Sequence, residues 1–361
     1  MSGFNLKSRW GNSVYVQTNT ARHLYCLSVR KLKMKKFLVN AVAALTIVVM
    51  VAGSTQAQGV KVDPNLKDYT PIAGISGAIK SVGSDTMNNM MTLWSEGFLK
   101  YYPNVRVEIE GKGSSTAPPA LISGASTFGP MSRLMKPAEV DAFEKKFGYK
   151  PIQLGTSIDM LAVYVHKDNP VQGLTLAQAD AIFSSTRKSG FNQDISKWGQ
   201  VGLTGTFKDA AISIYGRNSA SGTYGYFKKN VLGDGDYKPS VKEQPGSASV
   251  VQGVATDKNG IGYSGIGYKT ADVRAVPLSK DAETNAVPAS PEFAYTGEYP
   301  LARFLWLSVN HKPGSKLDPL RREFLKYIFS AQGQTDVVKD GYFPISAVIA
   351  EKSLQQVGIT D

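Results

Sequence analysis

Three short segments rich in glycine and hydroxyl side chains stand where a strand-like run gives way to a helical pattern. They cover residues 83–86, 111–116 and 217–223. A helix N-terminus presents unpaired N–H groups and a partial positive charge, and both favour an anion. Arg217 adds a planar fork of donors that matches two oxygens of a phosphate or a sulfate. Together the segments predict a site for a tetrahedral anion.

Each segment also has a simpler interpretation. A serine or threonine before a helix is most often only an N-cap, and an arginine at the end of a strand, such as Arg217, can form a surface salt bridge. Three such helix starts, two early in the chain and one later, are less readily explained as independent caps. We therefore expect them to surround one anion from both sides of a cleft.

From residue 77 onward, apolar β-prone runs alternate with helical patterns. This rhythm predicts a mostly parallel sheet covered by helices. The chain of 361 residues exceeds what one core supports, so we expect an α/β protein of two lobes, with lobe I at 77–160 plus 265–361 and lobe II at 161–264. Strands are expected at 78–82, 105–109, 128–131, 161–165, 212–215, 260–264 and 304–309, and helices at 85–101, 118–123, 137–147, 176–183, after Ser221, 317–330 and 333–340.

The N-terminal sequence indicates export. A basic start at 34–36, an uncharged apolar run at 37–53 and small residues up to Ala57 form the pattern of a signal peptide over 34–57, cut near Ala57. A permanent membrane anchor is the alternative, although the apolar run is short for a span. Residues 1–33 are interpreted as an extension from a wrongly chosen start codon. We expect a soluble periplasmic protein.

Two properties of the expected mature chain follow from that cleavage site. Cys26, the only cysteine, precedes it, so no thiol is left for a disulfide, for catalysis or for a lipid anchor. Eight of the basic residues and no acidic residue precede it as well, which lowers the formal charge from +12 to about +4. A weakly basic chain of this kind is not expected to bind nucleic acid.

At these motifs the sequence resembles the substrate-binding protein of the bacterial phosphate ABC transporter, from about Ile79 to the C-terminus. Arg217 followed by Ser221-Gly222-Thr223 matches the family's phosphate loop, and Gly113-Ser114-Ser115 resembles its Gly-Ser-Ser loop, whose site serine is Ser114 or Ser115. Residues 83–86 resemble its first loop and 299–303 its characteristic tail. The resemblance implies a periplasmic-binding-protein fold of two α/β lobes joined by two crossing segments.

One segment departs from the family pattern. Many members have an aspartate after Phe-Gly-Ala-Ser that accepts the proton of hydrogen phosphate, whereas this chain has Ser132 at that place and Arg133 next to it. A site that selects a protonated anion needs a fixed acceptor. Asp85 is one candidate, or else a carboxylate stabilising a helix start. Asp159 is the other, or else the partner of a salt bridge to Arg133 or Arg217.

The resemblance and the residues together define the expected site and partners. The ligand is inorganic phosphate, the partners are the membrane permease subunits of an ABC transporter, and the protein is expected to be a monomer without a cofactor, a metal or catalytic residues. The expected phosphate-binding residues are Ser84, Asp85, Thr86, Ser114, Ser115, Ser132, Arg133, Asp159, Arg217, Ser221, Gly222 and Thr223.

Three other functions stay open. A receptor for sulfate, molybdate or tungstate would use the same helix termini and hydroxyls. A secreted phosphate-ester hydrolase is less favoured, because His166 and His311 are the only histidines after the expected cleavage site and have no metal-ligand spacing. A phosphate scavenger without a transporter is the third.

Overall fold

The computed structural model describes residues 59–360. The expected signal peptide and upstream extension, at 1–57, lie outside the described residues. The fold below is that of the unit that begins at Val60. Over residues 59–360 we find no helix with the length and apolar character needed to span a bilayer.

One mixed sheet of nine strands runs through this unit, in the order β2-β1-β3-β11-β4-β8-β6-β7, with β9 joined to β4. The pairs that β1 makes with β2 and β3, and that β6 makes with β7 and β8, are parallel. In contrast, β11 is antiparallel to β3 and β4, and β8 is antiparallel to β4. The α/β class is confirmed, although the sheet is mixed rather than mostly parallel.

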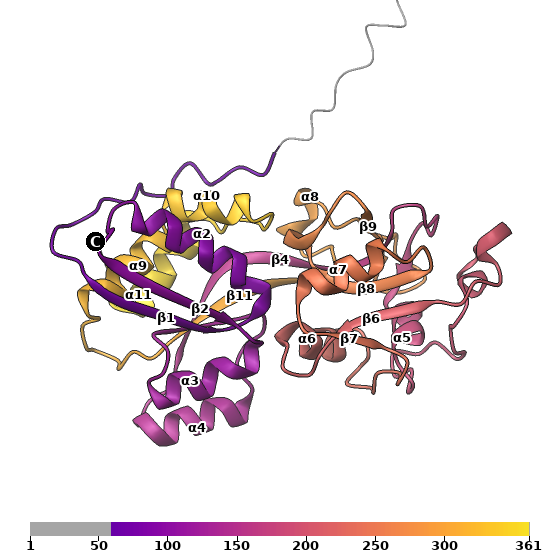
Figure 1. Ribbon diagram of the computed structural model, residues 1–361, viewed down its shortest axis with the longest axis horizontal. Coiled ribbons are helices and arrows are strands. Elements are labelled where there is room, and N and C mark those ends of the chain that lie inside the picture. Colours follow the sequence, from indigo (N-terminus) through magenta and orange to yellow (C-terminus); the bar gives the residue numbers. More distant parts are fainter. Residues whose placement is uncertain (1–58, 361) are drawn as a thin grey trace, which may run out of the picture. The chain divides into compact units, whose positions relative to one another are not determined.

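The first half of the unit combines the beginning and the end of the chain, which Figure 1 draws in purple and yellow. Its elements are β1 (Gly77–Gly83), η1 (Asp85–Met87), α2 (Asn88–Leu99), β2 (Val105–Gly111), η2 (Ser114–Thr116), α3 (Ala117–Ser123), β3 (Phe128–Met131), α4 (Pro137–Phe147), β11 (Ala302–Val309), α9 (Pro319–Ile328), α10 (Ala331–Lys339) and α11 (Ala347–Gln356).

The second half is built from the middle of the chain. Its elements are β5 (Leu174–Thr175), α5 (Leu176–Phe183), η3 (Trp198–Val201), η4 (Gly205–Phe207), β6 (Ser213–Arg217), α6 (Gly222–Asn230), β7 (Lys242–Gln244), α7 (Ser247–Ala255), β8 (Gly260–Gly265), η5 (Ile266–Tyr268), β9 (Val273–Ala275), β10 (Leu278–Ser279) and α8 (Pro291–Ala294).

Strand β4 (Ile152–His166) belongs to both halves. Its residues 152–160 pair with β11, and its residues Leu161 to Val165 pair with β8. Figure 1 shows β4 and β11 passing side by side between the two groups of elements. The two halves therefore share a continuous backbone strand.

Successive side chains of β11 point into two separate cores of the first half. Leu305 and Leu307 belong to the core formed with α2, α9, α10 and α11, where Trp94 and Phe324 are completely buried. Trp306, which lies between these leucines, packs against the smaller core of α3 and α4. Successive strand residues point to opposite faces, so helices cover both faces of this part of the sheet.

Residues 266–301, expected in lobe I, pack mainly with the second half, although Tyr268 and Tyr295 also donate to the carbonyls of Asp85 and Pro344 in the first half. β9 pairs with the end of β4, and β10 pairs with β5. Val276, Leu278 and Leu301 are fully or almost fully buried in the core that contains α5, α6, β6 and β8. Most of this segment thus packs with the second half before β11 begins. β9 and β10 have only two or three residues each, which gives them no readable period.

Candidate anion-binding site

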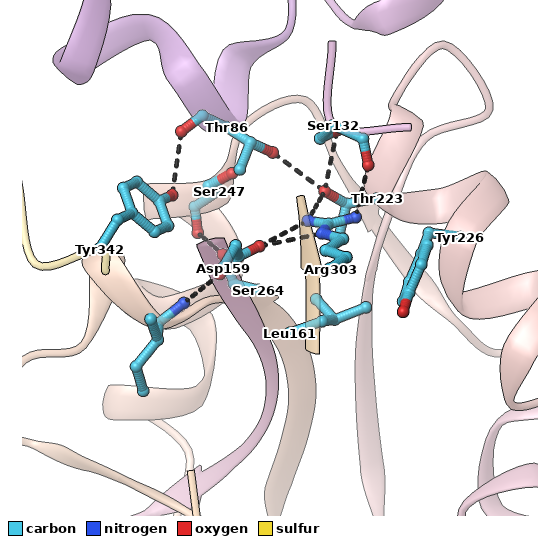
Figure 2. Close-up of polar contacts among 12 residues, drawn as sticks. Thr86, Ser132, Asp159, Leu161, Thr223, Tyr226, Ser247, Ser264, Arg303 and Tyr342 are labelled. Atoms are coloured by element: carbon cyan, nitrogen blue, oxygen red, sulfur yellow. Dashed lines mark hydrogen bonds and ion pairs between the residues drawn. The ribbon is translucent and has the colours of Figure 1, made fainter. Parts of the chain in front are cut away.

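Four buried hydroxyl groups meet where the two halves touch. Thr86 Oγ1 lies 2.9 Å from Thr223 Oγ1, which lies 3.4 Å from Ser132 Oγ, and Ser132 Oγ lies 3.2 Å from Ser114 Oγ. All four side chains are completely buried. A hydroxyl proton rotates to suit its acceptor, so the cluster can turn several donors toward one anion. Figure 2 shows Thr86, Ser132 and Thr223 facing one another.

Gly222 is the residue that allows this close approach. A Cβ placed on Gly222 would lie 2.2 Å from Ser114 Oγ and 2.6 Å from Ser132 Oγ. Both distances are far below van der Waals contact, and any side chain at 222 would fill the space between the hydroxyls. The glycine is followed by Thr223 in the first turn of α6, so the helix start itself reaches the cluster.

Arg217 lies at the end of β6, and its side chain is 1% exposed. Nη1 lies 3.2 Å from Asp85 Oδ2 and donates to Ser247 Oγ at 2.6 Å, and Nη2 donates to the Pro245 carbonyl at 3.1 Å. Burial lowers the pKa of Arg217, and the Asp85 carboxylate opposes that shift. Asp85 and Arg217 come from different halves, so their ion pair joins the two.

One donor of Arg217 is left without a partner. Its Nε is buried and makes no hydrogen bond within residues 59–360. An unsatisfied buried donor on a charged group is costly, and such exceptions call for an explanation. An acceptor with negative charge, such as an anion oxygen, would satisfy it.

A second guanidinium, that of Arg303, reaches the same hydroxyls from β11. Arg303 Nη2 donates to Asp159 Oδ2 at 2.8 Å and to Thr223 Oγ1 at 2.9 Å, and Nη1 donates to the Ser132 carbonyl at 2.9 Å. Nε also donates to Asp159 Oδ2, at 3.0 Å. Figure 2 shows this guanidinium between Asp159 and Thr223, with the Tyr226 ring nearby.

The pairing of β4 with β11 explains why Asp159 meets Arg303. The two residues are direct partners in the antiparallel register. Asp159 is completely buried, and its Oδ1 accepts from the Ile266 amide at 3.0 Å. The sequence analysis considered Arg133 or Arg217 as the partner of Asp159, and the structure corrects this to Arg303. The register between strands more than a hundred residues apart cannot be read from local patterns.

The site carries as many positive as negative side chains without a bound anion. Two guanidiniums, Arg217 and Arg303, are each matched by one carboxylate, Asp85 and Asp159. An added anion is therefore stabilised by oriented N–H and hydroxyl dipoles and by the arginines' remaining donor capacity, more than by an excess of positive charge.

The other serines named from the sequence, Ser221, Ser115 and Ser84, form hydrogen bonds in the loops around the cluster. Ser221 is the N-cap of α6, and its Oγ accepts from the amides of Thr223 and Tyr224 at 3.1 and 3.4 Å. Ser115 Oγ donates to the Ala220 carbonyl at 2.9 Å, which joins the halves. Ser84 is buried and donates its amide to the Pro130 carbonyl at 2.8 Å. These three residues surround the cluster and support its loops.

Arg133 uses its planar fork elsewhere. Nη1 and Nη2 donate to the two carboxylate oxygens of Glu139 at 2.7 and 2.8 Å, and Nη1 also bonds the Leu134 carbonyl. Partial burial raises the pKa of Glu139, but the Arg133 guanidinium and the Lys136 amide hold it below its usual value. The structure thus places the guanidinium of Arg133 in a bidentate ion pair at the start of α4.

Two tyrosines brace the loop that carries Asp85 and Thr86. Tyr268 of η5 donates to the Asp85 carbonyl at 2.8 Å, and Tyr342 donates to the Thr86 carbonyl at 3.0 Å. Burial raises the pKa of both tyrosines above the ordinary value. Each hydroxyl therefore keeps its proton and remains a donor.

Sequence reasoning missed two of these groups. Arg303 was included only as part of a tail motif, without a role. Ser247 was not named, yet its amide donates to Asp85 Oδ2 at 2.7 Å and its Oγ accepts from Arg217. The signal was present, because Gly246-Ser247 precedes Val250, Val251 and Val254 at helical spacing. It is a fourth helix start of the same kind.

Comparison with known proteins agrees with this geometry. The family model described as "PBP superfamily domain" matches residues 53–332. The phosphate-binding protein PstS of Pseudomonas aeruginosa is 52% identical over 88% of this chain and 98% of its own length. This chain belongs to the PstS family within the PBP superfamily.

Solved structures of other phosphate-transporter binding proteins have the same fold as this chain. A phosphate ABC transporter substrate-binding protein with bound phosphate from Clostridium perfringens is 26% identical, with a TM-score of 0.63, and the match covers 74% of this chain and all of that one. An ABC-type phosphate transport receptor from Vibrio cholerae has a TM-score of 0.57 at 21% identity over 74% of this chain and all of that one, which shows the fold. The expected periplasmic-binding-protein fold is confirmed.

Proposed function

We propose that this PstS-family protein binds inorganic phosphate and delivers it to the membrane permease of an ABC-type phosphate importer. One observation carries the proposal. The buried Arg217 has a donor, Nε, with no partner among the described residues, and its ion-pair partner Asp85 directly precedes Thr86, one of four buried hydroxyl residues that meet. The name of the Pseudomonas aeruginosa relative and the bound phosphate of the Clostridium perfringens structure support the same ligand.

The phosphate oxygens are divided among groups of both halves in this proposal. Arg217 Nε and the hydroxyls of Thr86, Ser114, Ser132 and Thr223 are the donors. Inside a dry site each such hydrogen bond is stronger than in water. The hydroxyl contacts that these groups make with one another are exchanged for contacts with the anion.

Asp85 is the acceptor of the phosphate proton in this proposal, rather than Asp159. Both oxygens of Asp159 already accept from Arg303 or the Ile266 amide. Asp85 Oδ2 faces Arg217 and the Ser247 amide, whereas Oδ1 accepts no hydrogen bond within residues 59–360, and the side chain is 22% exposed. A fixed carboxylate facing an unprotonated oxygen would repel it, which discriminates against sulfate.

The two halves act as lobes that close on the anion. The bond from Thr86 to Thr223 and the ion pair from Asp85 to Arg217 cross between them. β4 and β11 are the crossing strands, so a change in their backbone angles would open the cleft. The lobes of this proposal are residues 77–160 with 302–361, and residues 161–301. The protein acts as a monomer in the periplasm, after export and cleavage near Ala57.

Calorimetry with phosphate and sulfate tests the proposal. The protein starting at residue 58 is freed of bound anion by unfolding, dialysis and refolding, and is titrated with each anion from pH 5 to 8. We expect tight binding of phosphate and much weaker binding of sulfate, molybdate and tungstate. Equal affinity for phosphate and sulfate would identify a general oxyanion receptor instead.

A further inference from the structure

Asp340, at the end of α10, is a buried carboxyl group without a cationic partner. Its side chain is 6% exposed. Oδ1 accepts a hydrogen bond from Asn89 Nδ2, and Oδ2 has no hydrogen-bond partner within the described residues. No lysine, arginine or histidine of residues 59–360 forms an ion pair with it. A buried carboxylate in such surroundings is costly, whereas a neutral carboxyl group is less so.

The elements packed around Asp340 place no cation in contact with it, and the nearest arginines, Arg303 and Arg217, are paired with Asp159 and Asp85. From β4 it faces the negative field of Asp159, from α2 the neutral amide of Asn89, and from η5 and the segment after α10 the phenols of Tyr268 and Tyr342. Burial and Asp159 together raise the pKa of Asp340 to about 7, against a lowering by Asn89.

The charged groups of α10 itself do not compensate for this. Lys339, the neighbour of Asp340 in sequence, directs its ammonium to Asp336 at 2.7 Å. Asp336 Oδ2 in turn accepts from Tyr327 at 2.6 Å. The local charges of the helix end are therefore paired with each other, and Asp340 is left as the group that can gain or lose a proton.

Short connections link Asp340 to the anion site. Asn89 stands in the first turn of α2, directly after the loop that carries Asp85 and Thr86. Tyr342, two residues after Asp340, donates to the Thr86 carbonyl at 3.0 Å. The segment 340–342 therefore holds both ends of the segment 86–89.

We propose that Asp340 is a positioning residue whose protonation state sets the phosphate affinity of the site. As a neutral acid it anchors Asn89, and with it the start of α2, without adding charge. Once ionised, it adds an unpaired negative charge next to the segment that holds Thr86, within reach of the field of Asp159. Like charges repel strongly where water is excluded, so phosphate binds more tightly on the acidic side of this titration. The inference rests on the proposed function.

The test is phosphate calorimetry on the wild type, Asp340→Asn and Asp340→Ala at intervals from pH 5.5 to 8.5. Phosphate itself titrates in this range, but the ratio of wild-type to variant affinity at each pH removes its contribution. We expect Asp340→Asn to match the wild type at low pH and to exceed it by about threefold or more at high pH. Asp340→Ala also removes the acceptor of Asn89, so it should bind more weakly than Asp340→Asn at every pH.

A matched control is Asp336→Asn, which removes a carboxylate one turn earlier that already has a cationic partner. Its affinity ratio to the wild type should not change across this range. A constant ratio for Asp340→Asn would overturn the proposal while leaving phosphate binding intact. No phosphate binding by any of these proteins, at any pH, would overturn the proposed function and this inference with it.

Discussion

Arg303 Nη2 donates to Asp159 Oδ2 and to Thr223 Oγ1 at the same time, at 2.8 and 2.9 Å. One guanidinium thus ties a crossing strand of the sheet to the helix start of the second half. Because Asp159 is completely buried, Arg303 is also the group that makes its charge tolerable.

Removing that partner should destabilise the fold strongly. Arg303→Ala leaves Asp159 as an unpaired buried carboxylate, and breaking such a pair costs about 3–5 kcal/mol. Urea unfolding of the wild type and variant measures the loss. The double variant Arg303→Ala with Asp159→Asn should recover part of it, since the unpaired charge is gone. Equal destabilisation of the single and double variants would contradict this account.

Arg217→Ala should weaken phosphate binding by well over tenfold. The loss of a charge-assisted donor costs about 1.5–3 kcal/mol, and Asp85 would lose its partner as well. Calorimetry gives the affinity, and Arg106→Ala is the control because Arg106 is exposed on β2. An affinity of Arg217→Ala close to that of the wild type would remove Arg217 from the site.

Gly222→Ala should abolish measurable phosphate binding in the micromolar range. The added Cβ would lie 2.2 Å from Ser114 Oγ, and the hydroxyls must move apart to accept it. Gly225→Ala in the same helix is the matched control, because its Cβ would meet nothing nearer than 3.8 Å. That control should bind normally, with a stability up to about 1 kcal/mol higher from helix propensity. Similar affinities for the two variants would show that the close approach is not needed.

Asp85→Asn should reduce the discrimination between phosphate and sulfate. An amide no longer repels an unprotonated oxygen, so the ratio of the two affinities should fall by about tenfold or more. Competition calorimetry at pH 7 measures the ratio. Asp68→Asn, which changes an exposed carboxylate that accepts from Gln332 and bonds no site residue, controls for net charge. A ratio unchanged in Asp85→Asn would direct attention to Asp159.

Asp340→Asn should change how stability depends on pH. The folded-state pKa of Asp340, about 7, lies above the ordinary aspartate value of about 3.8, so the folded protein holds a proton that the unfolded chain has lost. The free energy of unfolding of the wild type therefore falls as pH rises from about 4 to about 7. The variant has no such group and its free energy of unfolding does not fall for this reason. At pH 8 the variant should be more stable, by an amount on the order of 2–4 kcal/mol. Thermal unfolding in matched buffers provides the comparison, and parallel pH profiles would contradict it.

Long periodic elements could be predicted from the sequence, and the shortest could not. The expected helix at 137–147 coincides with α4, and the expected helix at 176–183 coincides with α5. β9 and β10 have too few residues to show a period. In β4 only Leu161–Val165 was read as a strand, because residues 152–160 mix polar and apolar side chains where both faces are covered.

The candidate site shows the same division between local and long-range information. Glycine and hydroxyl residues at helix starts are a local signal, and Thr86, Ser114 and Thr223 do meet. Which acceptors each arginine side chain pairs with depends on tertiary packing. Arg133 turned toward Glu139, six residues on, and Arg303 toward Asp159 through strand register. Residue type alone could not separate these outcomes.

The position of β11 also fixes an order of assembly. This strand lies between β3 and β4, yet it follows them in sequence by more than a hundred residues. During synthesis or export, the edges of β3 and β4 that face β11 therefore stay unpaired until residue 309 has emerged. Unpaired strand edges can form hydrogen bonds with the wrong strand or with another chain. The middle of the chain can complete its own core before the first half closes. Deletions that remove the last strand should trap an aggregating intermediate rather than a working half-protein.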